Sequence, residues 1–112
     1  MTAQAVERIV EEMTEILVRE AKPRKVVLFG SHARGAAGPT SDVDFLVIED
    51  EPFGPGRSRR REMARLSRAL ARFPVPQDIL VYTAEEAEHW ASSRNHVVAR
   101  ALREGRVLYE RA

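Results

Sequence analysis

Five residues of this chain have types and spacing that suit chemistry on phosphate groups. Gly30 and Ser31 follow a short apolar run, while Asp42 and Asp44 open a second run and Asp78 opens a third. Strands normally avoid aspartate, and two carboxylates at positions i and i+2 point from the same face, about 7 Å apart. Like charges so placed repel each other unless a cation lies between them. The spacing of Asp42 and Asp44 therefore predicts a metal site.

The metal that suits such a site is Mg²⁺, which takes carboxylate oxygens and completes its shell with water and phosphate. If Asp78 lies on a neighbouring strand, three carboxylates can hold two Mg²⁺ ions about 3.5–4 Å apart, which clamp a phosphoryl group and activate an attacking hydroxyl. Gly30 lets the backbone approach a phosphate, and Ser31 offers a hydroxyl and nearby free N–H groups. We therefore expect in-line displacement at phosphorus. Taken singly, each feature is also consistent with an ordinary turn, strand start or loop cap.

The elements that must position these residues follow from hydrophobic periodicity. Apolar residues at helical spacing predict helices over 3–20, 57–73, 84–91 and 93–104. Strand-forming runs predict strands over 25–29, 42–48, 78–82 and, more weakly, 106–109. Ser31 is a suitable N-cap for a further short helix, and Ser92 or Ser93 for the last helix. The order of elements predicts a small α/β or α+β fold, with helices packed on a sheet.

Composition narrows the class of protein further. The 112 residues are enough for one domain, 1–112, and a net charge of +1 argues against bulk binding of nucleic acid. With no cysteine, the chain has no disulfide, thiolate metal site or cysteine nucleophile. No apolar run approaches the length of a membrane span, and two glutamates interrupt the place where a signal peptide is apolar. We expect a cytoplasmic protein with no membrane partner.

Read together, the motifs resemble those of a known family. The sequence GSHARG at 30–35, SDVDFLV at 41–47 and the later Asp78 in PQDILV resemble the signature of the minimal nucleotidyltransferases, within the DNA polymerase beta-like nucleotidyltransferase superfamily. The resemblance covers nearly the whole chain, and it implies a mixed β-sheet with flanking helices, Mg²⁺ and ATP. It implies catalytic and metal-binding carboxylates at Asp42, Asp44 and Asp78, and nucleotide-binding residues at Gly30, Ser31 and Arg34.

The resemblance also implies a biological role. Small members of the family are commonly the antitoxin partner of a helical HEPN-type ribonuclease toxin, and they silence the toxin by transferring AMP from ATP to one of its tyrosines. This chain departs from the family at AAGPT, 36–40, where members often carry a basic residue. The missing basic residue would contact a phosphate. The three acidic positions, Asp42, Asp44 and Asp78, are all occupied by aspartate.

Other functions remain open at the level of sequence. A non-catalytic antitoxin that acts by contact alone does not need the intact acidic triad. A nucleotidyltransferase acting on a small molecule usually carries an additional domain, so we expect a protein acceptor. An arginine stripe on the predicted helix 57–73 is consistent with a solvated face, or with a docking surface for an acidic partner or RNA; its members are Arg61, Arg65, Arg68 and Arg72. Arg34 suits either a phosphate contact or an ion pair with a core carboxylate.

Overall fold

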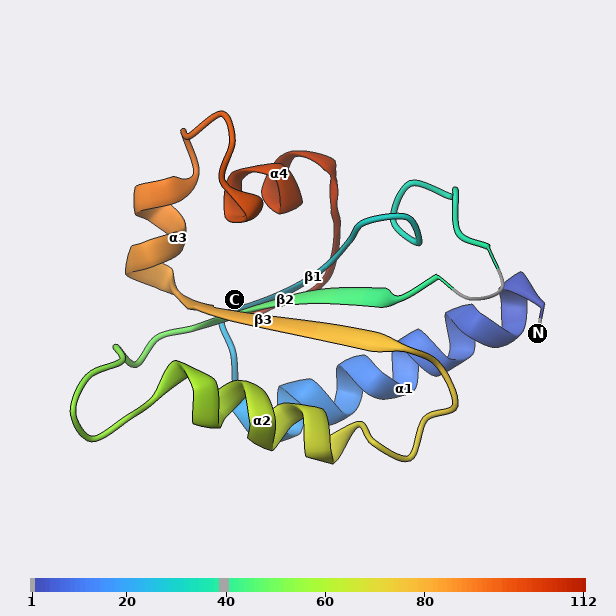
Figure 1. The fold of residues 1–112 in the computed structure, drawn as a ribbon, viewed down its shortest axis with the longest axis horizontal. Helices are drawn as coiled ribbons and strands as arrows, with labels where there is room; N and C mark the ends of the chain where they lie inside the picture. The colour runs from blue at the N-terminus through green and yellow to red at the C-terminus, as the bar shows by residue number, and fades with distance from the viewer. Residues whose placement is uncertain (1, 39–40) are drawn as a thin grey trace.

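The computed structural model describes residues 2–38 and 41–112, which form a four-stranded mixed sheet flanked by helices (Figure 1). The strands are β1 (Lys25–Phe29), β2 (Val43–Glu49), β3 (Gln77–Thr83) and β4 (Arg106–Glu110). Their spatial order is β3-β2-β1-β4, with β1 antiparallel to β2 and to β4, and β2 parallel to β3. The predicted fold class is confirmed, and the closing strand joins the main sheet at its edge.

The helices cover the two faces of the sheet in pairs. One face packs against α1 (Ala3–Ala21) and α2 (Arg59–Ala69), and the other against α3 (Ala84–Trp90) and α4 (Val97–Glu104) (Figure 1). The parallel pairing of β2 with β3 requires a crossover, and α2 provides it. Within the described residues, no helix has the length and apolar character needed to cross a bilayer.

Strand β2 has apolar residues on both faces because each face meets a helix layer. Val43, Phe45 and Val47 belong to the core beneath α1 and α2, whereas Leu46 and Ile48 belong to the core beneath α3 and α4. Strand periodicity predicts this alternation for the run 42–48, and the structure confirms it. By the same alternation, the side chain of Asp44 lies on the α3–α4 face.

Two predicted helix starts are wrong. The short helix expected at Ser31 is a run of hydrogen-bonded turns over residues 31–35, bounded by Gly30 (φ 75°) and Gly35 (φ 71°) in the left-handed region. Helix α4 begins at Val97 and not near Ser92 or Ser93. Its cap is His96, whose side chain accepts the Val98 N–H at 3.1 Å while its ring stacks on Trp90 at a centroid separation of 4.1 Å.

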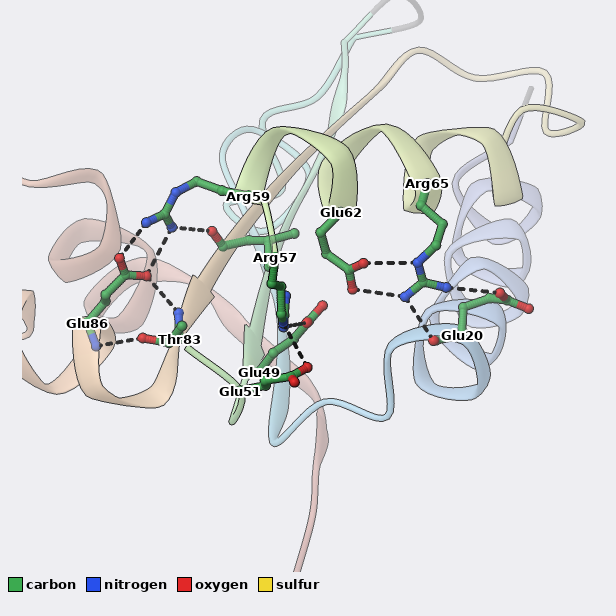
Figure 2. Close-up of polar contacts among 10 residues, drawn as sticks. Glu20, Glu49, Glu51, Arg57, Arg59, Glu62, Arg65, Thr83 and Glu86 are labelled. Atoms are coloured by element: carbon green, nitrogen blue, oxygen red, sulfur yellow. Dashed lines mark hydrogen bonds and ion pairs between the residues drawn. The ribbon is translucent and has the colours of Figure 1, made fainter. Parts of the chain in front are cut away.

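Charged side chains link the loop before α2 to the far end of β2, and link α2 to α1 (Figure 2). Arg57 pairs with the buried Glu49 and, at 2.9 Å, with the exposed Glu51. Arg65 donates to Glu62 within α2 and reaches Glu20 of α1 at 3.2 Å. One member of the predicted arginine stripe is therefore engaged inside the molecule. The other three, Arg61, Arg68 and Arg72, are exposed.

Glu49 is the residue of this network whose negative charge is least favourable in the folded protein, because its carboxyl is buried. Burial, followed by the neighbouring carboxyl of Glu62, raises the pKa of Glu49 to about 8, although Arg57 opposes the shift. One carboxyl oxygen of Glu49, Oε2, is buried with no hydrogen-bond partner among the described residues. A raised pKa in the folded state means that this group favours folding below its unfolded pKa, and that this contribution is lost as the pH rises toward 8.

We predict that Glu49→Gln removes this pH-dependent loss. Relative to the wild type, the variant should gain at least about 1 kcal/mol of unfolding free energy between pH 5 and pH 9, because one pKa unit corresponds to about 1.4 kcal/mol. Urea unfolding at several pH values measures the gain. Glu51→Gln is the matched control, since Glu51 pairs with the same arginine but is exposed; its difference from the wild type should not change with pH. Equal slopes for both variants would contradict the assignment.

Candidate active site

The sheet brings two of the predicted carboxylates side by side. Asp44 is directly opposite Asp78 in the parallel β2–β3 register, and it is opposite Phe29 in the antiparallel β1–β2 register. Asp42 lies just before the first residue of β2. Asp44 is half-buried, whereas Asp42 and Asp78 are exposed. Parallel pairing therefore places the start of β3 beside the start of β2. This meets the condition from the sequence that Asp78 lie on a strand next to that of Asp44.

Gly30 approaches Asp44 so closely that no other residue fits without movement. A Cβ placed on Gly30 would lie 2.3 Å from Asp44 Oδ2 and 3.3 Å from its Cγ. The backbone of Gly30 also adopts a φ of 75°, which L side chains rarely accept. The turn after β1 is therefore seated directly against the carboxylate of β2, which explains why glycine occupies this position.

The turn itself offers backbone donors. Arg34 N–H donates to Gly30 O at 3.2 Å, and Ala36 N–H donates to Ser31 O at 2.9 Å. Within residues 2–38 and 41–112, the N–H groups of Ser31 and His32 have no hydrogen-bond partner. Adjacent free N–H groups in a tight turn form a concavity suited to an anion. The turn thus keeps anion-binding capacity even though it does not continue into the expected helix.

The far side of this loop is tied to the start of β2. His32 Nε2 lies 3.2 Å from Ser41 O, and Ser41 Oγ accepts the Gly38 N–H at 2.8 Å. His32 therefore has a loop-holding contact that its type and position in the sequence did not predict. Pro39 and Thr40, in the segment that departs from the family pattern, lie outside the described residues.

Asp44 is poised to favour a bound cation. Its pKa is raised from the ordinary value first by burial, and then by the charges of Asp78 and Asp42. The charges of His32 and Arg34 act in the opposite direction. Among the side-chain hydrogen bonds of the described residues, none is donated to the carboxylate of Asp44. A partly desolvated carboxylate beside two like charges is the arrangement that a divalent ion relieves.

The donor set fits Mg²⁺ in its chemistry, since it consists of carboxylates with open solvent access for water and phosphate ligands. In the arrangement of the described residues, however, no group of three or more His, Cys, Asp or Glu side chains converges on one metal position. The backbone register places Asp44 beside Asp78, while the convergence of all three carboxylates requires rotation of the exposed side chains.

A small cavity of about 170 Å³ adjoins the turn and adds residues that sequence reasoning missed. Gly30 and Arg34 line it together with Arg100 and Glu104 of α4. Arg34, which belongs to the turn, lies at this cavity, and its positive charge lowers the pKa of Asp44. No sequence signal marked Arg100, because its proximity to Gly30 arises only from the packing of α4 on β1.

The fold and the paired strand-start aspartates define a nucleotidyltransferase. The chain belongs to the nucleotidyltransferase domain family, whose model matches residues 10–108. It is similar to a protein of Methanocaldococcus jannaschii named "Putative protein adenylyltransferase". The two sequences are 30% identical in an alignment of 108 positions that covers 92% of this chain and 97% of the relative.

Solved structures share the fold. A "putative nucleotidyltransferase" from Sulfolobus solfataricus superposes with a TM-score of 0.63 at 20% identity, over 93% of this chain and 79% of that one. A toxin-antitoxin structure with AMP-PNP gives a TM-score of 0.58 at 20% identity, over 90% of this chain and 73% of that one. A mutant of the toxin-antitoxin MntA-HpeT gives 0.56 at 18% identity, with the same coverage.

Gly30 and Gly35 form a matched pair for testing the close approach to Asp44. Both have positive φ, but a Cβ on Gly35 meets nothing within 4 Å. We predict that Gly35→Ala lowers the unfolding free energy by about 1–2 kcal/mol, the backbone cost alone, and that Gly30→Ala costs more because it also displaces Asp44. Thermal unfolding measures both effects. If both variants lose the same unfolding free energy, the side chain of Asp44 moves away from residue 30 with no measurable loss of stability.

Replacing Asp44 should stabilise the metal-free protein. Because its raised pKa disfavours the ionised form in the fold, Asp44→Asn should raise the unfolding free energy at pH 7, and solvent screening of this partly exposed group keeps the gain below about 1 kcal/mol. The gain should disappear when the pH falls below the ordinary carboxyl range, where Asp44 is protonated in both states. Thermal unfolding in EDTA at pH 7 and pH 3 measures it. Asp50→Asn, which removes a carboxylate paired with Arg24 and Arg111, should bring no gain.

Proposed function

We propose that this nucleotidyltransferase transfers AMP from ATP to a hydroxyl of a protein partner, a tyrosine of a HEPN-type toxin, and thereby acts as an antitoxin. The observation that carries the proposal is the register of Asp44 with Asp78 against the Gly30 turn. That arrangement puts carboxylates and free backbone donors at the same end of the sheet, where β1 ends and β2 and β3 begin. The relative named as a protein adenylyltransferase, which matches nearly end to end, supports a protein acceptor. The two toxin-antitoxin structures support a toxin as that partner.

The roles divide between the turn and the strand starts. The N–H groups of Ser31 and His32 seat the β- and γ-phosphates, with Gly30 allowing their close approach, and Arg34 adds a positive charge. Asp42 and Asp44 would hold Mg²⁺, and Asp78 would add a further carboxylate ligand. Bound Mg²⁺ supplies charge stabilisation at the transferring phosphoryl group.

The transfer itself is an in-line displacement. The acceptor oxygen forms a bond to the α-phosphorus of ATP, the bond from that phosphorus to the bridging oxygen breaks, and pyrophosphate leaves. Asp78, which is exposed beside Asp44, takes the proton of the acceptor hydroxyl. Because Asp42 and Asp78 are both exposed, a hydroxyl presented on the surface of a partner protein can reach this edge of the sheet.

The deciding experiment is intact mass spectrometry of the protein purified together with the product of its neighbouring gene. After addition of ATP and Mg²⁺, the partner should gain AMP units, one pyrophosphate should be released for each unit, and EDTA should stop both. Asp44→Asn should slow the gain at least about a hundredfold, because it removes several kcal/mol of charge stabilisation. Asp50→Asn, the remaining aspartate outside the site, should leave the rate unchanged.

The other outcomes point to the alternatives. A stable complex without a mass change would establish an antitoxin that acts by contact, provided that Asp44→Asn neutralises the toxin as well as the wild type does. Pyrophosphate release without a modified protein would establish a small-molecule acceptor. Strong RNA binding that weakens steeply with salt would direct attention to the exposed arginines of α2.

A further inference from the structure

A small cavity on the α3–α4 face of the sheet collects positive charge from two distant parts of the chain. Arg34 comes from the turn after β1 and Arg100 from the middle of α4, and both line the cavity of about 170 Å³ that adjoins Gly30. Helix α4 packs on β1, and this packing brings Arg100 to the turn (Figure 1). Two positive side chains that meet at one cavity favour an anion between them.

Neither arginine is neutralised inside the described part of the molecule. Both are exposed, and neither side chain forms an ion pair or a hydrogen bond with any described residue. By contrast, Arg57, Arg59 and Arg65 are each paired with a glutamate. Glu104, four residues after Arg100, lines the same cavity, but no ion pair joins it to a described arginine. The two guanidinium groups therefore keep their donors available for an external anion.

The cavity suits phosphate groups better than a whole nucleotide. Its volume of about 170 Å³ is smaller than the roughly 300–1,000 Å³ of pockets that enclose drug-sized ligands. The free N–H groups of Ser31 and His32 belong to the same turn as Gly30 and Arg34. Backbone donors in a turn and guanidinium groups both bind phosphate oxygens well. The arrangement therefore indicates a polyphosphate whose end points toward α4.

The order of the strands gives this polyphosphate a direction. At this end of the sheet, Asp78 of β3, Asp44 of β2 and the Gly30 turn after β1 follow one another on neighbouring strands. Neighbouring strands lie about 4.8 Å apart, so the row spans about 10 Å. The cavity is at the β1 end of the row. We propose that Arg100, together with Arg34, binds the terminal phosphate of ATP and stabilises the pyrophosphate that leaves.

This direction agrees with the displacement at the α-phosphorus, and the inference rests on the proposed function. The acceptor oxygen attacks from the side of Asp78, which takes its proton. The bond to the bridging oxygen breaks on the opposite side, and pyrophosphate departs toward Arg100 with the electron pair of that bond. Attack and departure thus lie on opposite sides of the phosphorus, as an in-line displacement requires. The guanidinium groups offset the charge that develops on the leaving group.

Ligand binding to the full chain in the presence of Mg²⁺ tests the assignment without any acceptor. ATP and pyrophosphate are titrated by calorimetry, and AMP, which lacks the terminal phosphates, is followed by ligand-observed NMR. Arg100→Gln should weaken ATP and pyrophosphate at least about tenfold, because a charge-assisted hydrogen bond to phosphate is lost. The affinity for AMP should not change. Since Arg100 is exposed, the variant should unfold at the wild-type temperature.

Two matched variants separate this contact from a general effect of charge. Arg94→Gln removes the same charge from an exposed arginine that lies just before α4 and does not line the cavity, so it should bind ATP like the wild type. Glu104→Gln removes a negative charge from the cavity and should tighten ATP binding. In the transfer reaction, Arg100→Gln should lower kcat as well as raise the KM for ATP, because the contact strengthens as pyrophosphate leaves.

Three results would overturn the proposal. These are an unchanged ATP affinity in Arg100→Gln, an equal loss of ATP and AMP affinity in that variant, and an equal loss of ATP affinity in Arg94→Gln. Each of them leaves the proposed function standing, provided that the wild type binds ATP and modifies its partner. A wild-type chain that binds no ATP would instead contradict the proposed function itself.

Discussion

The structure of the functional edge depends on the absence of a side chain at Gly30. The carboxylate of Asp44 occupies the space where a Cβ of residue 30 would lie, so the turn after β1 is held against the start of β2. That single close approach places free backbone N–H groups beside the aspartates. It also keeps Asp44 half-buried beside Asp78, and this is why its pKa is raised. Backbone donors that suit an anion and carboxylates that suit a cation are thereby brought together at one end of the sheet.

The carboxylates at the two ends of β2 have opposite surroundings: Glu49 has an ion-pair partner, and Asp44 has none among the described residues. At the far end, the buried carboxyl of Glu49 forms an ion pair with Arg57, while Arg65 pairs with Glu62 of its own helix and with Glu20 of α1. At the functional end, the described residues supply Asp44 with no hydrogen bond, and only the more distant charges of His32 and Arg34 offset it. The charges of His32 and Arg34 do not cancel the negative charge at this end of β2, which a bound Mg²⁺ would offset, and such strain commonly accompanies function.

Much of this arrangement could be predicted from the sequence because it is local or periodic. The alternation of apolar residues along β2 assigned Val43, Phe45 and Val47 to one face, and the structure agrees. The helix cap at His96 and the turn over 31–35 could not be predicted. His96 acts as a cap because its ring is also stacked on Trp90, and the turn stops because two flanking glycines take positive φ. Both depend on neighbours or backbone conformations that residue type alone does not specify.

The sequence by itself indicated the family through the resemblance of its motifs. Residue type and periodicity determined the order of the elements, apart from the short helix expected at Ser31, and which residues could carry charge at the strand starts. The tertiary structure alone decided that Asp78 stands opposite Asp44, that Arg100 adjoins the Gly30 turn, and that Arg65 is engaged by Glu20. It also decided that the guanidinium of Arg59 donates to the Val81 carbonyl of β3. Each of these joins residues far apart in the chain, and strand order and helix packing set such distances after local structure has formed.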